Sequence, residues 1–329
     1  MKTYRWGILG TGNIARKFAR SLGLLGNVNL YSVGSRDRDR ADSFAHEFGF
    51  AKSFGSYEAF LSDRDLDVVY ISSPHSHHLE HTMLALKHGK HVICEKPMSL
   101  NADEVKVMAR EAKSRKLFLM EALWPPFQPS YLKAEEIFKE ESLGKLKHIR
   151  GKFAFNAPYD PQRRTYNIEL GGGSLLDIGI YPIMDILRYM GYPDSFEATS
   201  VLTGTGADES TSVIFRYSDG RLAEAYSSFA NCAGISTEFN FEKGNIILSR
   251  GRDRSQHLVI ETQEGETEEM LFSPPAQGYQ LEAVEVMHCI DKGLIESPVV
   301  PLSFSIQLAE IMDAVRIRTG IKYPGRDRW

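Results

Sequence analysis

The feature that most constrains the fold is an alternation, up to about residue 122, between short apolar runs and amphipathic stretches. Runs such as V-V-Y-I-S-S at 68–73 are apolar on consecutive residues, and helical patterns such as N-I-A-R-K-F-A-R-S-L at 13–22 separate them. Strands of this kind are typical of a parallel sheet that helices cover on both faces. The pattern therefore predicts an α/β domain over residues 1–122, built on a doubly wound parallel sheet.

The second half of the chain has a different pattern, in which apolar and polar residues alternate. In I-S-T-E-F-N-F at 235–241, Ile235, Phe239 and Phe241 share one face of a strand, and Asp219-Gly220 is a strong hairpin signal between two strand-like runs. Residues 123–329 are therefore predicted to form an α+β domain with a large open, mainly antiparallel sheet. Helical patterns at about 175–190, 278–292 and 303–319 can cover its apolar face, and we expect the last to pack back on the first domain.

The composition limits the possible partners. The net charge is −4 and the pI is about 6.2, so there is no electrostatic reason to expect a nucleic acid or an anionic membrane as partner. We find no apolar run of the roughly 18 residues that a membrane span needs, and no signal-peptide pattern. Three widely spaced cysteines argue against a disulfide framework. We expect a cytoplasmic protein.

A glycine-rich loop follows the first predicted strand and opens the first helix. Gly10, Gly12 and Ala15 give the pattern G-x-G-x-x-A. Gly10 permits a tight turn, Gly12 lets the backbone approach a pyrophosphate, and the N–H groups at the helix start face the anion. The alternative is a glycine-rich turn without a ligand, but the strand–turn–helix context favours dinucleotide binding. The first domain is thus predicted to be a Rossmann domain.

The residues at the end of the second strand favour NADP. An NAD enzyme normally has an acid there to bind the ribose, whereas this chain has Ser35 and Arg36. A guanidinium can bind a 2′-phosphate that a carboxylate would repel. Two alternatives stay open: Arg36 is a solvated residue beside a helix capped by Ser35 or Asp37, or Asp37 reaches the ribose of NAD.

Two further motifs carry candidate catalytic groups. Lys96, in H-V-I-C-E-K-P at 91–97, lies at the carboxyl end of a predicted strand, where ligands of parallel sheets bind. In G-G-G-S-L-L-D-I-G-I-Y-P at 171–182, Asp177 and Tyr181 are four residues apart and share a helix face. Asp177 either caps its own helix together with Ser174 or faces Lys96 and the substrate, and the two readings are compatible. For Lys96, the alternative is a Glu–Lys pair that ends a strand.

Other polar and aromatic residues have less specific signals. His77 and His81 are spaced as two metal ligands would be, but no cysteine or second carboxylate cluster obviously completes a site, so we predict no metal. Trp124 and Phe127 either line a substrate pocket or pack at the domain junction. Arg164 either contacts the substrate or lies in a solvated loop.

The motifs G-T-G-N-I-A, I-S-S-P-H-S-H-H, H-V-I-C-E-K-P and G-G-G-S-L-L-D-I-G-I-Y-P, in this order, resemble the Gfo/Idh/MocA oxidoreductase family. M-E-A-L-W at 120–124 is most similar to its branch of dimeric dihydrodiol and D-xylose dehydrogenases. The resemblance implies a catalytic lysine at Lys96, an aspartate at Asp177, an acid/base tyrosine at Tyr181, and a homodimer formed through the open sheet. One departure is Pro126, where relatives have an arginine near the substrate.

The resulting hypothesis is an NADP-dependent oxidoreductase, with NAD as the alternative cofactor, that acts on a secondary alcohol or carbonyl of a sugar or cyclic diol. A free tyrosine has a pKa near 10, and a lysine ammonium about 4 Å away would lower it by at most roughly three units. Two alternatives are a non-catalytic NAD(P)-binding regulator and an NAD-tethered glycosidase. The predicted cofactor-binding residues are Gly10, Thr11, Gly12, Asn13, Ile14, Ser35, Arg36, Arg40, Ser73, Pro74, His78, Glu95 and Lys96. The predicted substrate-binding residues are Trp124, Phe127 and Arg164.

Overall fold

The computed structural model describes residues 2–251 and 255–327, and it divides into two compact units. The first unit contains the chain up to Phe127 together with Pro275–Ile306, and the second contains Gln128–Pro274 and the chain from Gln307 onward.

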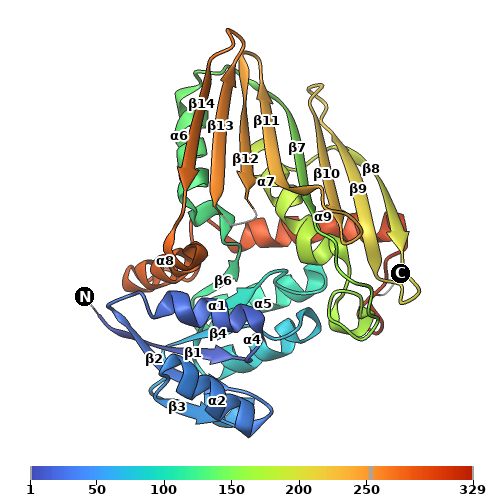
Figure 1. Cartoon of the computed structure of the whole chain (residues 1–329). Helices are drawn as coiled ribbons and strands as arrows, with labels where there is room; N and C mark the ends of the chain where they lie inside the picture. The colour runs from blue at the N-terminus through green and yellow to red at the C-terminus, as the bar shows by residue number, and fades with distance from the viewer. Residues whose placement is uncertain (1, 252–254, 328–329) are drawn as a thin grey trace. The chain divides into compact units, whose positions relative to one another are not determined.

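The first unit is built on a parallel sheet of six strands in the order β3-β2-β1-β4-β5-β6 (Figure 1). Every residue of β4 is buried, which explains why its sequence is apolar on consecutive positions. The chain order reverses between β1 and β4, where doubly wound folds bind their ligands. The predicted doubly wound sheet is confirmed. The strands are β1 (Tyr4–Leu9), β2 (Val28–Gly34), β3 (Lys52–Phe54), β4 (Val68–Ile71), β5 (His91–Glu95) and β6 (Leu119–Ala122).

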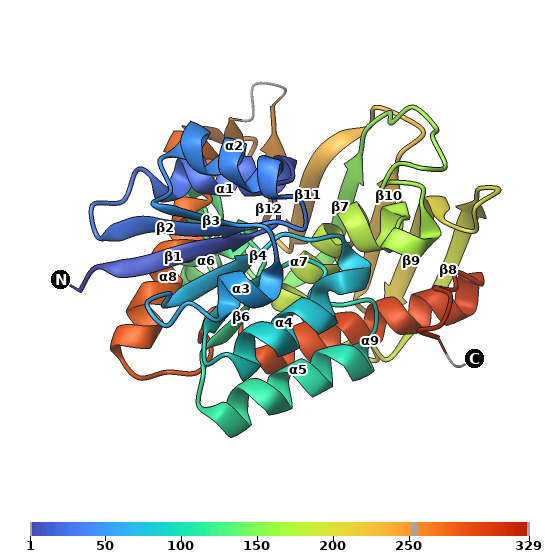
Figure 2. The ribbon, with the colours of Figure 1, turned by 90° about the horizontal axis from the view of Figure 1, so that it is seen from below.

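Helices cover both faces of this sheet. The crossovers from β1 to β3 run in one direction along the sheet and those from β4 to β6 in the other. Because such crossovers are right-handed, α1 and α2 cover one face and α4 and α5 the opposite one (Figure 2). The helices are α1 (Asn13–Leu22), α2 (Arg38–Phe48), α3 (Tyr57–Leu61), α4 (His78–Lys87) and α5 (Ala102–Arg115), with short turns η1 (His75–His77) and η2 (Pro125–Phe127).

The segment Pro275–Ile306 belongs to the first unit, whereas the sequence pattern assigned everything after residue 122 to the second. Its helix α8 (Gln280–Asp291) packs on α1. The Tyr4 hydroxyl donates to Asp291 Oδ1 at 2.5 Å, and the backbone N–H of Leu119 donates to the carbonyl oxygen of Ile295 at 3.0 Å. These contacts attach the segment to the first unit. The C-terminal helix α9 (Leu302–Thr319) runs from the first unit into the second.

The second unit is built on an eight-stranded sheet in the order β14-β13-β12-β11-β7-β10-β9-β8 (Figure 1). Neighbouring strands are antiparallel except β7 and β10, which are parallel, so the predicted mainly antiparallel sheet is confirmed. A turn at Asp219-Gly220 joins β9 and β10, as the hairpin signal predicts. The strands are β7 (Leu146–Ala154), β8 (Ser195–Leu202), β9 (Asp208–Arg216), β10 (Leu222–Ser228), β11 (Gly234–Phe241), β12 (Gly244–Arg250), β13 (Gln256–Thr262) and β14 (Thr267–Phe272).

One face of this sheet is covered by helices. Helix α6 (Pro129–Glu140) packs on β12, β13 and β14, and α7 (Ile180–Met190) packs on β7 and β10. The approach of α7 requires a glycine at Gly151, because a Cβ atom there would lie 2.6 Å from the Cβ atom of Pro182. The apolar alternation predicted for 235–241 fits this arrangement, since Phe239 is fully buried.

The segment Ile168–Met190 is long and apolar enough to cross a membrane by length and composition alone. In the protein, 89% of its most apolar window is buried, as in a core helix, so this property is weak evidence for a membrane span. The segment contains the turns η3 (Ile168–Leu170) and η4 (Leu175–Gly179) as well as α7.

Candidate active site

The glycine-rich loop has the geometry that phosphate binding needs. Gly10 has a φ of +100°, and a Cβ atom there would lie 3.1 Å from Ser72 Oγ, so the loop passes close to the end of β4. Gly12 is the N-cap of α1; no side chain caps this helix, and its first turn has no acidic residue. The amino end of α1 is therefore suited to an anion, and open space surrounds Gly12. Thr11, Asn13 and Ile14 lie in this loop and the first turn of α1.

At the end of β2, the polar residues Ser35, Arg36 and Asp37 make different contacts. The Asp37 carboxylate accepts a hydrogen bond from the backbone N–H of Arg40 at 3.1 Å, so Asp37 caps α2, and Ser35 Oγ accepts from the backbone N–H of Asp37 at 3.2 Å. The Arg36 side chain is exposed and lies near the Tyr57 hydroxyl. Burial raises the pKa of Tyr57, and the Arg36 guanidinium opposes that rise. The acid in this region is thus engaged in capping, while the guanidinium is accessible.

His78 connects the loop after β4 with the turn after β5. Its side chain is fully buried, with Nδ1 2.8 Å from the carbonyl oxygen of Pro97 and Nε2 2.8 Å from that of Ser73. Carbonyl oxygens only accept hydrogen bonds, so the protonated ring nitrogen of His78 is the donor in its contact. His78 therefore fixes the Ser73–Pro74 segment against the turn that carries Lys96.

The turn around Lys96 rests on buried carboxylates. The Lys96–Pro97 peptide bond is cis, and Lys96 itself is half-buried. The Tyr70 hydroxyl donates to Glu95, and the backbone N–H of Met98 donates to Glu121 Oε1 at 2.8 Å. Burial raises the pKa of Glu121 to about 7, although the Met98 N–H and the Lys96 charge oppose the rise. The sequence motifs gave no role to Glu121, and its signal was an acid within the apolar run L-F-L-M-E-A at 117–122.

A further carboxylate, Glu282 on α8, is also buried in this region of the first unit. Burial and the charge of Glu95 raise its pKa well above the ordinary value. Glu282 lies in the segment that the sequence pattern placed in the second domain.

In the second unit, the start of the D-I-G-x-Y helix is held by an acid from the sheet. Asp208 Oδ2 accepts hydrogen bonds from Ser174 Oγ at 2.7 Å and from the backbone N–H of Leu175 at 2.8 Å. Gly173 has a φ of +123°, and a Cβ atom there would lie 2.2 Å from Asp208 Oδ1. Asp208 therefore takes the capping role that the sequence pattern offered to Asp177. It is distant in sequence, so no local motif could reveal it.

Asp177 is paired with Arg164 instead. Its Oδ1 and Oδ2 atoms lie 2.9 Å and 3.0 Å from the two terminal nitrogens of the Arg164 guanidinium. The Asp177 side chain is 8% exposed and that of Arg164 is 43% exposed. The pair is bidentate, which fixes the orientation of the carboxylate. The structure thus brings together two of the predicted site residues of the second unit.

Tyr181 lies at the start of α7, next to Pro182. Its side chain is half-buried, and its ring contacts Phe153 of β7 with the ring centroids 5.5 Å apart. Asp177 and Tyr181 lie in the continuous helical segment formed by η4 and α7, as the i, i+4 spacing predicts.

The predicted aromatic residues lie in the first unit. The Trp124 ring lies 6.1 Å from that of Tyr279, and Phe127 is buried at 8% exposure in η2. Trp124 therefore packs against the segment that returns to the first unit after the second sheet.

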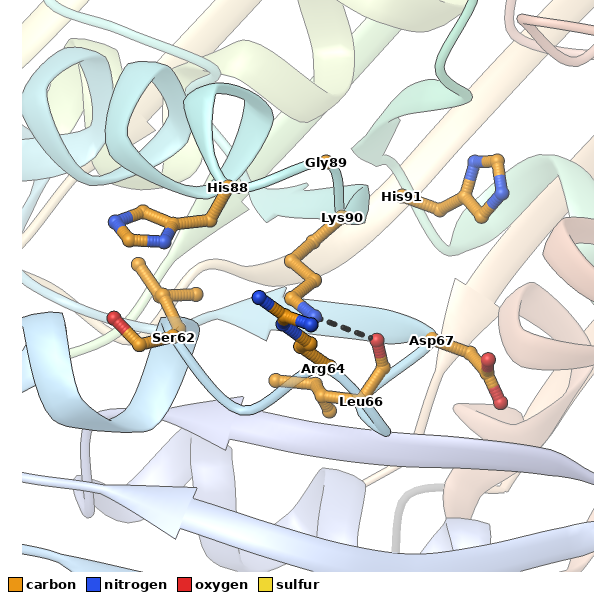
Figure 3. Close-up of a pocket in the computed structure, with 9 residues that line it drawn as sticks. Ser62, Arg64, Leu66, Asp67, His88, Gly89, Lys90 and His91 are labelled. Atoms are coloured by element: carbon orange, nitrogen blue, oxygen red, sulfur yellow. Dashed lines mark hydrogen bonds between the residues drawn. The ribbon is translucent and has the colours of Figure 1, made fainter.

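A cavity of about 530 Å³ opens at the amino ends of β4 and β5, the edge of the sheet opposite to the glycine-rich loop (Figure 3). Lys90 lines it and donates hydrogen bonds from Nζ to the carbonyl oxygens of Asp63 at 2.5 Å and Leu66 at 3.0 Å. Dinucleotides bind at the carboxyl ends of such strands, so this cavity is not the candidate cofactor site.

Comparisons with known proteins agree with this arrangement. A family model described as the oxidoreductase family with an NAD-binding Rossmann fold matches residues 4–123, and the corresponding C-terminal domain model matches residues 131–247. The trans-1,2-dihydrobenzene-1,2-diol dehydrogenase of Mus musculus is 35% identical over 97% of this chain and 98% of its own length. The enzyme of the same name from Homo sapiens is 34% identical over the same shares of the two chains.

Solved structures are also similar. KijD10, a 3-ketoreductase from Actinomadura kijaniata in complex with NADP and TDP-benzene, has a TM-score of 0.85 and 25% identity, covering 97% of this chain and 98% of its own. A levoglucosan dehydrogenase in complex with NADH and L-sorbose has a TM-score of 0.87 over 97% of both chains. At 19% identity, this second likeness shows the fold alone.

Proposed function

Because the chain belongs to the Gfo/Idh/MocA family of NAD-binding oxidoreductases, we propose that it transfers a hydride between NADP and a secondary alcohol or carbonyl carbon of a small sugar or cyclic diol. The observation that carries this proposal is the position of Lys96. It lies at the carboxyl end of β5, in a turn that His78 ties to the loop after β4. The trans-dihydrodiol dehydrogenases that are 35% identical over nearly the whole chain support a cyclic diol as one substrate class.

The residues at the end of β2 support NADP as the cofactor. The exposed Arg36 can bind a 2′-phosphate, and Asp37 already caps α2 through the backbone N–H of Arg40. A carboxylate in that role is less available to the ribose hydroxyl that NAD presents. The neighbour KijD10 was solved with NADP, while the levoglucosan dehydrogenase was solved with NADH.

In the proposed mechanism, Tyr181 is the acid/base group. The bound nicotinamide supplies a hydride acceptor during alcohol oxidation. The Tyr181 phenolate takes the proton of the substrate hydroxyl while the hydrogen on the same carbon leaves as a hydride, so the alcohol becomes a carbonyl. In reduction, Tyr181 returns the proton to the oxygen. The Lys96 ammonium stabilises the phenolate, because a nearby positive charge favours the ionised form.

The pair of Asp177 and Arg164 would orient the substrate. Arg164 holds the Asp177 carboxylate in a fixed direction, and the guanidinium is 43% exposed, so a substrate oxygen can approach the pair. Trp124 and Phe127 would supply apolar surface to a sugar ring or a diol ring. We also propose a cytoplasmic location and a homodimer formed through the sheet of the second unit.

The decisive experiment is a spectrophotometric screen of dihydrodiols, aldoses and 2-keto sugars, with NADP and NAD in parallel. We expect turnover of at least one cyclic diol or sugar, with a higher kcat/KM for NADP than for NAD. A protein that retains bound NAD through dialysis, and shows no net cofactor turnover with any substrate, would contradict the proposal.

A further inference from the structure

Three side chains with metal-binding atoms gather at the amino end of α4, where His77 is the N-cap and Glu80 and His81 belong to the helix. One ring nitrogen of His77, one ring nitrogen of His81 and one carboxylate oxygen of Glu80 lie within 4.8 Å of one another. His77 Nδ1 is 3.7 Å from Glu80 Oε2, and the two imidazole rings are nearly parallel, with an interplanar angle of 20° and centroids 5.5 Å apart. The spacing i, i+3, i+4 places the three side chains on one face of a helix, so α4 preforms this cluster.

The orientation of His81 is fixed by contacts outside this cluster. Its Nδ1 atom lies 2.8 Å from Ser73 Oγ, and its ring packs edge-on against Tyr57 with the centroids 4.6 Å apart. Histidines that bind metals usually donate their second ring N–H to a neighbouring oxygen, which fixes the tautomer and leaves the other nitrogen as the ligand. Ser73 Oγ is such an oxygen, and it leaves Nε2 of His81 for a metal.

The sequence pattern of the two histidines alone predicted no metal, but the structure adds the Glu80 carboxylate as a third ligand. We propose that His77, Glu80 and His81 bind a divalent transition-metal ion of the zinc class, with water in the remaining positions. Two imidazoles and one carboxylate suit Zn²⁺, Co²⁺ and Ni²⁺, whereas Mg²⁺ and Ca²⁺ prefer sites made of oxygen ligands. The glycine-rich loop and the turn that carries Lys96 supply none of these ligands. The site is therefore distinct from the hydride-transfer groups.

Some charges around the cluster favour the binding of a cation and others oppose it. The Glu80 carboxylate offsets the partial positive charge at the amino end of α4, which by itself disfavours a cation. Arg36 is close enough to His81 to add a further unfavourable positive charge. Two of the ligand side chains are accessible, with 34% of His77 and 70% of Glu80 exposed, so an ion can enter without rearrangement of the core.

The site has a structural consequence for the neighbouring loop. Ser73 contacts His81 through its hydroxyl and His78 through its carbonyl oxygen, and His78 in turn contacts Pro97. A metal ion on His81 would therefore fix the first turn of α4 to the loop that follows β4. We expect it to raise the thermal unfolding temperature of the protein, because an ion that binds the folded state stabilises it.

The test uses the full-length protein without a histidine tag, stripped of metals with a chelator. Isothermal titration with Zn²⁺ should show one ion per chain. Co²⁺ should give the visible absorption of a site with nitrogen ligands, and added Zn²⁺ should abolish this absorption. The variants His77→Ala and Glu80→Gln should each weaken Zn²⁺ binding by roughly tenfold or more. The matched control is His46→Ala, which removes an exposed histidine of α2 and should leave Zn²⁺ binding unchanged.

Several results would overturn the proposal. One is the absence of Zn²⁺ binding to the stripped wild-type protein. Another is equal Zn²⁺ affinity of the wild type and the His77→Ala/Glu80→Gln double variant. Circular dichroism and the unfolding temperature of each metal-free variant show whether α4 is intact, so a loss of binding through misfolding is recognised. Stronger binding of Mg²⁺ than of Zn²⁺ would also contradict a site with two imidazole ligands.

Discussion

At the scale of single residues, our proposal divides the chemistry between Lys96 and Tyr181. We expect Tyr181→Phe to lower kcat by a factor of about 10²–10⁴, the usual contribution of a general acid or base. Lys96→Ala should also lower kcat and should move the rise of kcat for alcohol oxidation to higher pH, because the phenolate loses its stabilising cation. The measurement is kcat against pH for both variants.

The matched control for these variants is Tyr159→Phe, which removes the hydroxyl of an exposed tyrosine in the same unit. It should retain the activity and the pH profile of the wild type. If Tyr181→Phe and Lys96→Ala both keep turnover near the wild-type value, the assignment of these two residues is incorrect.

Arg36 determines the choice of cofactor in our proposal. Arg36→Ala should raise the KM for NADP by about tenfold or more, since it removes a charge-assisted contact to the 2′-phosphate, and should change the KM for NAD little. Arg38→Ala is the control, because Arg38, two residues further on at the start of α2, forms an ion pair with Asp42 at 2.9 Å. Equal effects of Arg36→Ala on both cofactors would contradict the role of a 2′-phosphate ligand.

Glu121 makes the stability of the protein depend on pH in a defined direction. Burial raises its pKa from 4.5 to about 7 in the folded state, so its contribution is most favourable below pH 4.5 and is lost as the pH rises towards 7. Glu121→Gln keeps an acceptor for the Met98 N–H, but the amide does not ionise, so the variant does not lose stability as the pH rises. Relative to the wild type, the variant should gain up to roughly 3 kcal/mol of unfolding free energy between pH 5 and pH 8.

Urea unfolding of both proteins at the two pH values measures this difference. The exposed Glu58→Gln variant serves as the control and should show no such trend. A stability difference between Glu121→Gln and the wild type that is the same at pH 5 and pH 8 would mean that Glu121 does not titrate in this range.

The site residues that the sequence predicted stand in local motifs, whereas those that it missed act through contacts between distant parts of the chain. Gly10, Lys96 and Tyr181 stand in local motifs whose spacing reflects one turn or one helix, so the chain order alone places them. Asp208 and Glu121 act through contacts with residues 33 and 23 positions away along the chain. Such contacts depend on strand order and register, which a single sequence does not specify.

At the scale of elements, the position of α7 against β7 controls the placement of Tyr181. The helix approaches the strand over Gly151, and it is anchored by Asp185, which accepts hydrogen bonds from Thr237 Oγ1 at 2.5 Å and from the Tyr131 hydroxyl at 3.1 Å. A Cβ atom at position 151 would meet Pro182, the residue after Tyr181, at 2.6 Å. Gly151→Ala should therefore push the start of α7 away from the sheet.

We expect Gly151→Ala to lower the free energy of unfolding by about 1–3 kcal/mol, the usual cost of overpacking, and to reduce kcat more than it changes the KM for the cofactor. Gly26→Ala is the control, because a Cβ atom at Gly26 has open space around it. Urea unfolding and steady-state kinetics measure both effects. A Gly151→Ala protein with unchanged kcat would show that the helix position is not critical for the chemistry.

The predictability of the elements follows the strength of their periodicity. The buried strands and the helix over 180–190 were predictable because their apolar patterns are long and unambiguous. The turn of π-helix at Leu175–Gly179 was not, since the same residues also fit an α-helix. Its position is set by Asp208, which holds the backbone N–H of Leu175 from a neighbouring strand.

At the scale of the whole molecule, the two-domain division of the sequence was too simple in one respect. The change from consecutive to alternating apolar residues indicates where the second sheet starts. The apolar pattern of a helix such as α8, in contrast, is the same whichever unit the helix packs on. Its assignment to the first unit depends on contacts with α1 and on the bond between Tyr4 and Asp291. These partners lie almost the full length of the chain apart.

The outer face of the second sheet, opposite to α6 and α7, carries exposed apolar side chains that a monomer would leave in water. Val201 is 59% exposed, Ile214 43%, Leu222 42% and Leu271 64%. Each points to this face by its register in β8, β9, β10 or β14, and polar residues such as Glu224 lie between them. Exposed apolar side chains on an otherwise polar sheet face are found at protein–protein interfaces.

We therefore expect a homodimer formed through this face, and a charge introduced on the face should disrupt it. Ile214 lies in β9, next to the edge strand β8, and a dimer formed through this face would bury a carboxylate introduced there at a desolvation cost. Light scattering over a series of protein concentrations should give the dimer mass for the wild type and the monomer mass for Ile214→Asp. Leu24→Asp, at a residue of the first unit that is 55% exposed, should remain dimeric. A monomeric wild type, or a dimer that tolerates Ile214→Asp, would show that the apolar residues of this face have another role.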